Sequence, residues 1–357
     1  MKTIVYFSDI FYPTFPRLEI NLVNRLKRRA DVKFCMFDDD PRLTKYAKAY
    51  EHLDVIPVAS VKQVVRLMTK KSLYVSRFDY GKYPAGQAAR QSRRLGARVF
   101  MHDVAGIDMA VREGPANYVA IKSEWLRGQM RKNRFMRAYD KSFVTGTIHF
   151  DEVAAPVDRA GFNKKYNLDP KKHLLLLTPA NPGEVNSQGG IEKDYRRIVQ
   201  IVSSLPQYQL MIKGHPFDYS HQYKKSKAII CKVTKYGNKS SWEVFARKYN
   251  IPVCSPEDGY NAIKCCRAVL NIRSSLALEI PMFYKPLINI NRQKYVTNWV
   301  FDPNTMIDIK LKNLKQTLEG KMRPVSKPKC DAYVTRHCCA NDGKAYKRIA
   351  WAVGQVL

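Results

Sequence analysis

Two apolar runs that end in polar residues decide the fold of this chain. The first is LMIKGHP at residues 210–216, and the second is VLNIRSSLALE at residues 269–279. Each run has the apolar character of a buried strand. In open parallel sheets the residues that follow a strand lie at the carboxyl edge, where ligands bind. The two segments therefore predict one ligand-binding edge in an α/β protein.

The polar residues at this edge suit a diphosphate group. His215 follows the first run, while Ser274 and Ser275 follow the second, where they open a predicted helix. The free N–H groups and the positive dipole end of a helix attract anions. Lys213 and Arg273 flank the same edge and add positive charge. We therefore predict that these five residues form a phosphate-binding site.

These segments resemble the donor-binding half of GT-B glycosyltransferases. The resemblance rests on His-Pro at residues 215–216, Ser-Ser at 274–275, Glu279 five positions after the first serine, and KPLI at 285–288. Similar elements occur in polyglycerolphosphate transferases, bacterial sialyltransferases and UDP-sugar 2-epimerases. The resemblance covers residues 173–290, and it implies that Glu279 accepts hydrogen bonds from the donor ribose. It also implies that no metal or other cofactor is needed.

Each of these residues has an ordinary structural interpretation as well. A His-Pro pair is often a turn, and Ser274 or Ser275 can simply cap a helix. Glu279 can favour a helix dipole, although its spacing forms no capping box with either serine. Their occurrence at these two strand ends, in this order, favours the phosphate site.

Two further loops follow strands of the same predicted sheet. The loop at residues 178–184 contains Asn181, which we expect to contact donor phosphate or sugar. The loop at residues 255–260 contains Glu257 and Asp258, where GT-B enzymes often hold the nucleobase. Its Glu-Asp-Gly sequence is similar to the general-base motif of some sialyltransferases. Here it follows the His-Pro segment when it should precede it, so we assign it no catalytic role.

The resemblance places the acceptor, and with it the general base, in the first domain. Asp103 is the first candidate because it directly follows the predicted strand at residues 98–102. A carboxylate there would remove a proton from an acceptor hydroxyl if it reaches hydrogen-bonding distance. His102, Glu113 and Asp9 are the further candidates. The structural alternatives are an Asp103 that caps a turn and a His102 that is packed.

The predicted reaction is transfer of a sugar from a nucleotide-sugar donor to a hydroxyl of a glycan or lipid-linked acceptor, with inversion. Negative charge accumulates on the departing diphosphate in the transition state, and the predicted phosphate site would stabilise it. A nucleotide-sugar epimerase or a polyol-phosphate transferase is the alternative within the resemblance.

Apolar periodicity predicts two Rossmann-like α/β domains with mainly parallel sheets, which in the GT-B architecture face each other across a cleft. A length of 357 residues exceeds what one core usually supports. We expect the domains at residues 1–150 and 173–335, a linker at 151–172, and a final helix in 336–357 that packs back on the first domain. The predicted strands cover residues 3–7, 32–37, 73–76, 98–102, 118–121, 142–145, 174–177, 209–212, 251–254, 269–272 and 286–290. The predicted helices cover residues 16–29, 61–69, 85–95, 198–205 and 345–356.

Composition favours a folded cytoplasmic protein. Apolar residues make up 45% of the chain, and no stretch approaches the roughly 18 apolar residues of a membrane span. The apolar run at residues 3–7 ends too early for the core of a signal peptide. Eight cysteines without a C-x-x-C spacing indicate reduced thiols. A partial metal site is the alternative for the four residues Cys330, His337, Cys338 and Cys339.

The net charge of +31 exceeds what solubility requires. The densest basic cluster lies at residues 123–139, where a helix would place Arg127, Arg131 and Arg134 on one side. Such a side suits an anionic membrane surface or an acidic acceptor. A solvated basic face is the simpler alternative. A nucleic-acid-binding protein is the rival outside enzymology, but no nucleic-acid motif accompanies the charge.

Three acidic residues at 38–40 raise two other ligand classes. They follow the second predicted strand, where an acid binds the ribose of NAD or FAD, but the turn after the first strand lacks the necessary glycine. They also resemble the metal-binding Asp-x-Asp of GT-A glycosyltransferases. An ordinary turn and helix start before Pro41 explains them equally.

Overall fold

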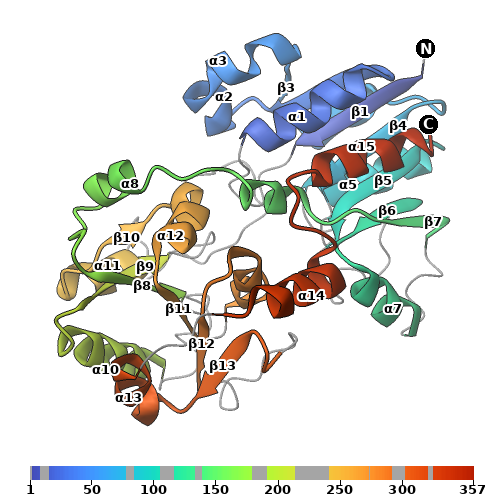
Figure 1. Cartoon of the computed structure of the whole chain (residues 1–357). Coiled ribbons are helices and arrows are strands. Elements are labelled where there is room, and N and C mark those ends of the chain that lie inside the picture. The colour runs from blue at the N-terminus through green and yellow to red at the C-terminus, as the bar shows by residue number, and fades with distance from the viewer. Residues whose placement is uncertain are drawn as a thin grey trace. The chain divides into compact units, whose positions relative to one another are not determined.

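The computed structural model describes residues 2–8, 16–77, 84–104, 116–132, 139–178, 191–213, 241–272, 274–291, 302–320 and 325–357. These residues fall into two compact units. The first unit contains the described residues up to Ala155 and those from Thr335 to Leu357, and the second contains those from Pro156 to Val334. Each unit is built on one parallel sheet (Figure 1).

The first unit has a seven-stranded sheet with the strand order β3-β2-β1-β4-β5-β6-β7, in which every pair is parallel. Six of its strands were predicted. The seventh, β3, was missed because it has only three residues, one of them a proline. The strands are β1 Thr3–Ser8, β2 Asp31–Phe37, β3 Ile56–Val58, β4 Leu73–Arg77, β5 Arg98–Val104, β6 Tyr118–Ile121 and β7 Lys141–Val144.

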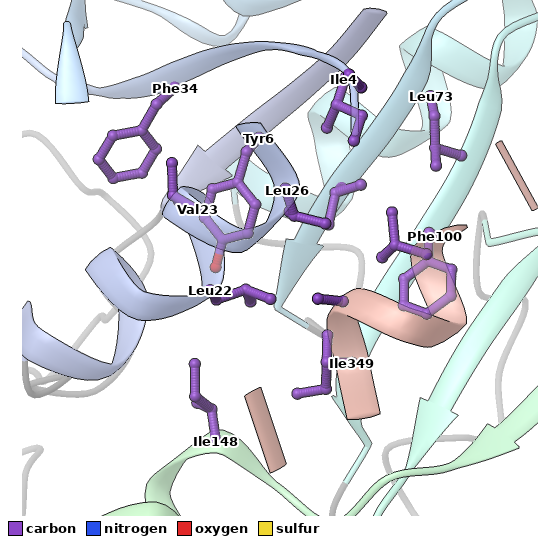
Figure 2. Close-up of a cluster of buried hydrophobic side chains, with 14 of the residues drawn as sticks. Ile4, Tyr6, Leu22, Val23, Leu26, Phe34, Leu73, Phe100, Ile148 and Ile349 are labelled. Carbon is purple, nitrogen blue, oxygen red and sulfur yellow. The ribbon is translucent and has the colours of Figure 1, made fainter. Parts of the chain in front are cut away.

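Helices cover both faces of this sheet because its strands are apolar on both sides. Along β1, Ile4 and Tyr6 enter one core while Val5 and Phe7 enter the other. The first core packs under α1 and the terminal helix α15, as Figure 2 shows, and the second packs under α4, α5 and α7. The helical elements are α1 Pro16–Lys27, α2 Pro41–Lys45, α3 Ala47–Tyr50, η1 Glu51–Leu53, α4 Val61–Arg66, α5 Pro84–Arg94, α7 Glu124–Lys132, η3 Ile148–Glu152 and α15 Ala345–Gly354.

The second unit has a six-stranded parallel sheet with the order β10-β9-β8-β11-β12-β13. One core lies between this sheet and helices α10, α11 and α13, while α12 packs near β8 and α8. The edge strand β13 was not predicted, since its burial and apolar character are incomplete. The strands are β8 His173–Thr178, β9 Tyr208–Lys213, β10 Val253–Cys254, β11 Ala268–Asn271, β12 Leu287–Ile290 and β13 Met306–Ile309.

The helical elements of the second unit include several that the periodicity did not predict. Residues 151–172, expected as an irregular linker, contain α8, whose single fully buried residue is Phe162. One buried position gives no helical period, which explains the omission. The elements are α8 Arg159–Lys165, α10 Ile191–Ser203, α11 Ser241–Lys248, η5 Pro256–Asp258, α12 Gly259–Cys265, η6 Ser275–Leu278, η7 Ile280–Phe283, η8 Leu311–Asn313, α13 Leu314–Glu319 and α14 Lys327–Cys338, which runs on into the first unit.

Candidate functional site

Part of the predicted site can be placed in the structure. The described candidates are Lys213, Ser274, Glu279, Glu257 and Asp258 in the second unit, and His102 and Asp103 in the first. Ser275 is placed by its backbone alone. Five further candidates lie outside the described residues, namely His215, Arg273, Asn181, Glu113 and Asp9.

A layer of hydrogen-bonded side chains closes the carboxyl edge of the second sheet. Thr178 at the end of β8 donates to Asn271 Oδ1 at 2.8 Å, and Asn271 donates from Nδ2 to Asn289 Oδ1 at 3.0 Å. The backbone N–H of Ser274 also donates to Asn271 Oδ1, at 3.1 Å. This layer therefore fixes the start of the segment that follows β11. Asn271 and Thr178 were not among the predicted site residues, although both are polar residues at apolar strand ends.

The segment after β11 differs from the expected helix. Ser274 is the N-cap of η6, and its hydroxyl accepts a hydrogen bond from Leu276 N at 3.4 Å. Two short 3₁₀ turns, η6 and η7, follow in place of one α-helix. Pro281 stands near the start of η7, and a proline lacks the N–H that would continue a helix. A four-residue turn aligns few peptide dipoles, so anion binding here depends more on side chains than the sequence predicted.

Lys213 ends β9 beside the first turn of α12. A Cβ atom added to Gly259 would lie 2.5 Å from Lys213 Cε, so the lysine stem passes closely over the start of that helix. Lys213 is also paired with Cys254 in the register of β9 and β10. Gly259 therefore provides the space that this side chain occupies. The predicted cation does lie at the carboxyl edge of the sheet.

Glu279 is held by an aromatic residue that the sequence analysis did not select. The Tyr260 hydroxyl donates a hydrogen bond to Glu279 Oε2, and the Tyr260 ring packs edge-on against Phe283 with centroids 5.2 Å apart. Tyr260 belongs to the loop after β10 that was expected to face the donor. The structure thus connects that loop with the segment following β11.

Asp258 links α8 to the start of α12 through hydrogen bonds. Its carboxylate accepts hydrogen bonds from Lys165 Nζ at 2.5 Å and from the Tyr166 hydroxyl at 2.6 Å. Burial alone would raise the pKa of Asp258, but the hydrogen bonds from Lys165 and Tyr166 outweigh it and lower the pKa. Asp258 is therefore an ionised structural anchor within the loop predicted to hold the nucleobase.

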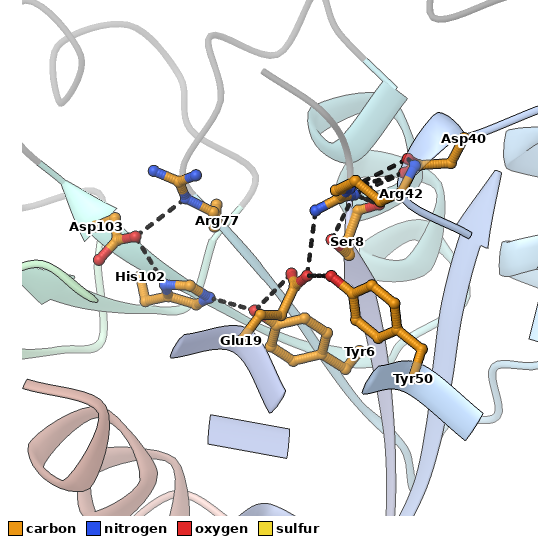
Figure 3. A network of polar contacts seen from close by, with 9 residues as sticks. All are labelled: Tyr6, Ser8, Glu19, Asp40, Arg42, Tyr50, Arg77, His102 and Asp103. Atoms are coloured by element: carbon orange, nitrogen blue, oxygen red, sulfur yellow. Dashed lines mark hydrogen bonds and ion pairs between the residues drawn. The ribbon is translucent and has the colours of Figure 1, made fainter. Parts of the chain in front are cut away.

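In the first unit, polar residues gather at the carboxyl ends of β1, β4 and β5 (Figure 3). Asp103 accepts hydrogen bonds from Arg77 Nε at 3.0 Å and from Ile148 N at 2.8 Å. Its backbone has a φ of 62°, and the pairing of β5 with β6 is irregular between Met101 and Val104. Such backbone conformations cost energy and concentrate at functional sites.

The electrostatic environment makes Asp103 a weak base. Burial alone would raise its pKa, but His102 and Arg77 outweigh burial and hold the pKa of Asp103 well below its usual range. His102 is fully buried, with Nε2 3.1 Å from the Tyr6 hydroxyl and Nδ1 3.4 Å from Asp103 Oδ2. Burial and the charge on Arg77 lower the pKa of the nearby His149 to about 3. The Asp103 carboxylate therefore holds the Arg77 side chain in place. Arg77 was not among the predicted site residues.

A second group of charged side chains lies beside this cluster, and the Tyr6 hydroxyl contacts both groups. The Arg42 guanidinium donates from Nη2 to Asp40 Oδ2 at 2.7 Å and to Ser8 Oγ at 2.9 Å, and from Nη1 to Glu19 Oε2 at 3.2 Å. All four side chains are buried. Asp40 also caps α2, which confirms the turn and helix start proposed for it. Its carboxylate is paired with Arg42, which argues against the metal-binding alternative.

The described part of the basic segment at residues 123–139 contains one helix. Within it α7 covers Glu124–Lys132, so Arg127 and Arg131 are helical while Arg134 lies outside the described residues. Arg127 pairs with Glu124, and Arg131 is exposed. No described helix has both the length and the apolar character needed to cross a membrane.

The cysteine thiols are the residues for which a partial metal site is the alternative prediction. None of the seven described cysteines forms a disulfide, and six of them are buried. Within the described ranges, no three His, Cys, Asp or Glu side chains come together in a way that could hold a metal ion.

No protein-family model matches this sequence, and no curated protein matches it. Solved structures do match. They include a putative UDP-N-acetylglucosamine 2-epimerase from Listeria monocytogenes, with 14% identity, a TM-score of 0.60, and coverage of 99% of this chain and 96% of that chain. The UDP-GlcNAc 2-epimerase from Methanocaldococcus jannaschii has 14% identity and a TM-score of 0.60, with coverage of 99% and 100%. The wall teichoic acid polymerase TagF has 13% identity and a TM-score of 0.59, with coverage of 99% and 88%. The chain therefore has the GT-B fold, as its sequence indicated.

Proposed function

We propose that this chain is a nucleotide-sugar-dependent glycosyltransferase that acts on a hydroxyl of a glycan or lipid-linked acceptor, with inversion and without a metal. The observation that carries the proposal is the carboxyl edge of the second sheet. There Lys213, Ser274 and the Tyr260–Glu279 pair lie at successive strand ends. This is the edge at which open α/β sheets bind ligands. A similar structure is described as a complex with UDP, and another as bound to UDP-GlcNAc.

We assign each part of the donor to residues whose side chains suit its chemistry. We assign the diphosphate to Lys213, Ser274 and Ser275 together with His215 and Arg273, because cations and N–H groups stabilise the charge of the leaving group. Glu279, oriented by Tyr260, would accept hydrogen bonds from the ribose. Asn181, Glu257 and Asp258 complete the proposed donor contacts.

The acceptor base is proposed to lie in the first unit. Asp103 is a weak proton acceptor because of its low pKa, and it is suited to hold Arg77. We therefore propose Asp103 as a positioning residue, with the buried His102 behind it. Glu113 and Asp9 are then the proposed base candidates.

We also propose that the protein is cytoplasmic and that Arg127 and Arg131 make peripheral contact with an anionic membrane.

A nucleotide-sugar epimerase is the second candidate. The observation that favours it is that several similar structures carry that name and match over 95–100% of both chains. A polyol-phosphate transferase is the related alternative, given the likeness to TagF. Incubation with UDP-GlcNAc and with CDP-glycerol, followed by analysis of the nucleotide and the sugar, separates the three. Transfer or hydrolysis releases the nucleotide, whereas epimerisation changes the sugar and leaves the nucleotide attached.

Donor binding is tested by thermal shift with UDP-, GDP-, CMP-, CDP- and dTDP-sugars. We expect one nucleotide class to raise the melting temperature, because a ligand that binds only the folded state stabilises it. The shift should shrink in His215→Ala. The proposed donor site is wrong if no nucleotide stabilises the wild type, or if the variant responds equally.

Gly259→Ala provides a sharper test of the second sheet's edge. The added methyl group occupies the space of Lys213 Cε, so we expect Lys213 to move and donor affinity to fall about tenfold, as for loss of one charge-assisted hydrogen bond. The free energy of unfolding should stay unchanged or rise by up to about 1 kcal/mol, because alanine favours a helix. Calorimetric titration and thermal unfolding measure the two quantities.

Gly128→Ala in α7 is the matched control for this substitution. Its added Cβ would meet no atom within 4 Å, so it should favour helix α7 without changing donor affinity. Unaltered donor affinity in Gly259→Ala would show that Lys213 makes no contribution to the donor site.

A further inference from the structure

A basic hollow lies at the opposite edge of the second sheet from the proposed donor site. Its lining includes His173 at the start of β8, Arg267 just before β11, and Lys285 just before β12. These strands are parallel, so their starts share the amino edge. Arg159 of α8 and Lys172 complete the positive charge, and the hollow has a volume of about 460 Å³.

The described lining of this hollow carries positive charge and no acidic residue. None of its described lining residues is Asp or Glu. Among the described residues, the four cations Arg159, Lys172, Arg267 and Lys285 form no ion pair. Lys285 Nζ donates to the carbonyl of Cys266 at 2.9 Å, and Arg159 Nη2 donates to that of Lys264 at 3.4 Å. Neutral carbonyls orient these groups but leave their charge uncompensated.

Lys285 shows that the cations affect one another. Burial is the main cause that lowers the pKa of Lys285, and the charges on Arg159 and Arg267 lower it further. Lys285 is the partly buried member of the four, while Arg159, Lys172 and Arg267 are exposed, and their like charges face one hollow. The donor site does not need this cluster, because it lies at the other edge of the sheet. A bound anion would remove the repulsion.

We propose that this hollow binds an anion containing two or more linked phosphate groups. Guanidinium groups pair with phosphate oxygens in a bidentate manner, and four cations match a multiply charged anion better than a single carboxylate. A volume of about 460 Å³ lies within the usual range for small-molecule sites.

The lining also indicates that the ligand needs no nucleobase. Among the described lining residues, Tyr284 has the one six-membered aromatic ring, and Lys327 Nζ covers that ring at 5.5 Å from its centroid. The Tyr284 hydroxyl donates to Asp331 at 2.7 Å. The ring is therefore a poor platform for stacking a base, and the phosphate groups would carry the recognition.

Inorganic pyrophosphate is the probe for this site, with binding followed by calorimetric titration and thermal shift. To keep the proposed donor site from contributing, the test is made in the His215→Ala protein as well as in the wild type. We expect pyrophosphate to bind both proteins and raise their melting temperatures. Arg267→Gln and Lys285→Met should each weaken binding by about tenfold or more. Sodium chloride at equal ionic strength controls for screening.

Two matched substitutions keep the test specific. Arg247→Gln in α11 and Lys312→Met in η8 remove exposed cations elsewhere in the second unit and should leave pyrophosphate affinity unchanged. Without ligand, Lys285→Met should be at least as stable as the wild type, because it relieves like-charge repulsion. The proposal is overturned if pyrophosphate does not bind His215→Ala, or if the control substitutions weaken binding as much as Arg267→Gln. Pyrophosphate binding that is lost only in His215→Ala would support the proposed donor site and would contradict the proposed site in the hollow.

Discussion

Arg42→Met is expected to lower the free energy of unfolding by about 3–5 kcal/mol, the cost typical of breaking a buried ion pair from one side. The guanidinium lies between the carboxylates of Asp40 and Glu19, and all three side chains are at most 5% exposed. The substitution keeps much of the side-chain volume but leaves two buried carboxylates facing each other without a cation. Urea unfolding followed by circular dichroism measures the change.

Neutralising the two carboxylates tests whether the Arg42→Met penalty comes from their uncompensated charge. The triple variant with Glu19→Gln and Asp40→Asn should regain part of the lost stability. Arg28→Met, which removes an exposed arginine just after α1, is the control and should change stability by less than about 0.5 kcal/mol. A loss in Arg42→Met no larger than in that control would mean that the buried network does not stabilise the unit.

The strands were predictable from sequence because parallel strands buried on both faces appear as short apolar runs. The run LLLL at residues 174–177 and the run ending at Ile121 are both strands in the structure. The strands β3 and β13 were missed because they are short and lie at sheet edges, where one or more residues remain exposed. Pattern alone does not separate such edge strands from loops.

The segment after β11 shows a different limit of sequence reasoning. The serines were correctly placed next to a strand end, and Ser274 does cap a helical turn. The expected α-helix became two 3₁₀ turns, since Pro281 lies only six residues beyond Ser275 and cannot supply an N–H. The proline was visible in the sequence, and it limits the helix more strongly than the apolar spacing favours it.

The polar network of the first unit could not be predicted, because its members come from separate parts of the chain. Glu19 lies in α1 next to the core residue Leu18, and a charged residue at such a position normally faces solvent. Its burial is explained by Arg42, which stands 23 residues later. The role of Arg77 was likewise not predictable from sequence, because it depends on the pairing of β4 with β5, which brings Arg77 next to Asp103.

Asp103→Asn is expected to lower kcat of the proposed transfer about 100-fold while leaving the donor KM unchanged, which is the effect of misplacing a group by about 1 Å. Asparagine tolerates the φ of 62° and can still accept the hydrogen bond from Ile148 N, so the fold should survive. What is lost is the negative charge that holds Arg77. The wild-type carboxylate adds stability at neutral pH because its pKa is lowered, and that stability is lost only as the pH falls below about 4.

A double-variant cycle distinguishes positioning from base catalysis at Asp103. If Asp103 acts through Arg77, Arg77→Met and Asp103→Asn remove the same interaction, so the double variant should be no slower than the slower single variant. The acid limb of the pH–rate profile should also persist in Asp103→Asn, because the base would be another group. Multiplicative losses together with disappearance of that limb would show instead that Asp103 takes the acceptor proton itself. Its low pKa would then have to rise when substrate binds and draws Arg77 away, so the same residue would change from an anchor to a base within one catalytic cycle.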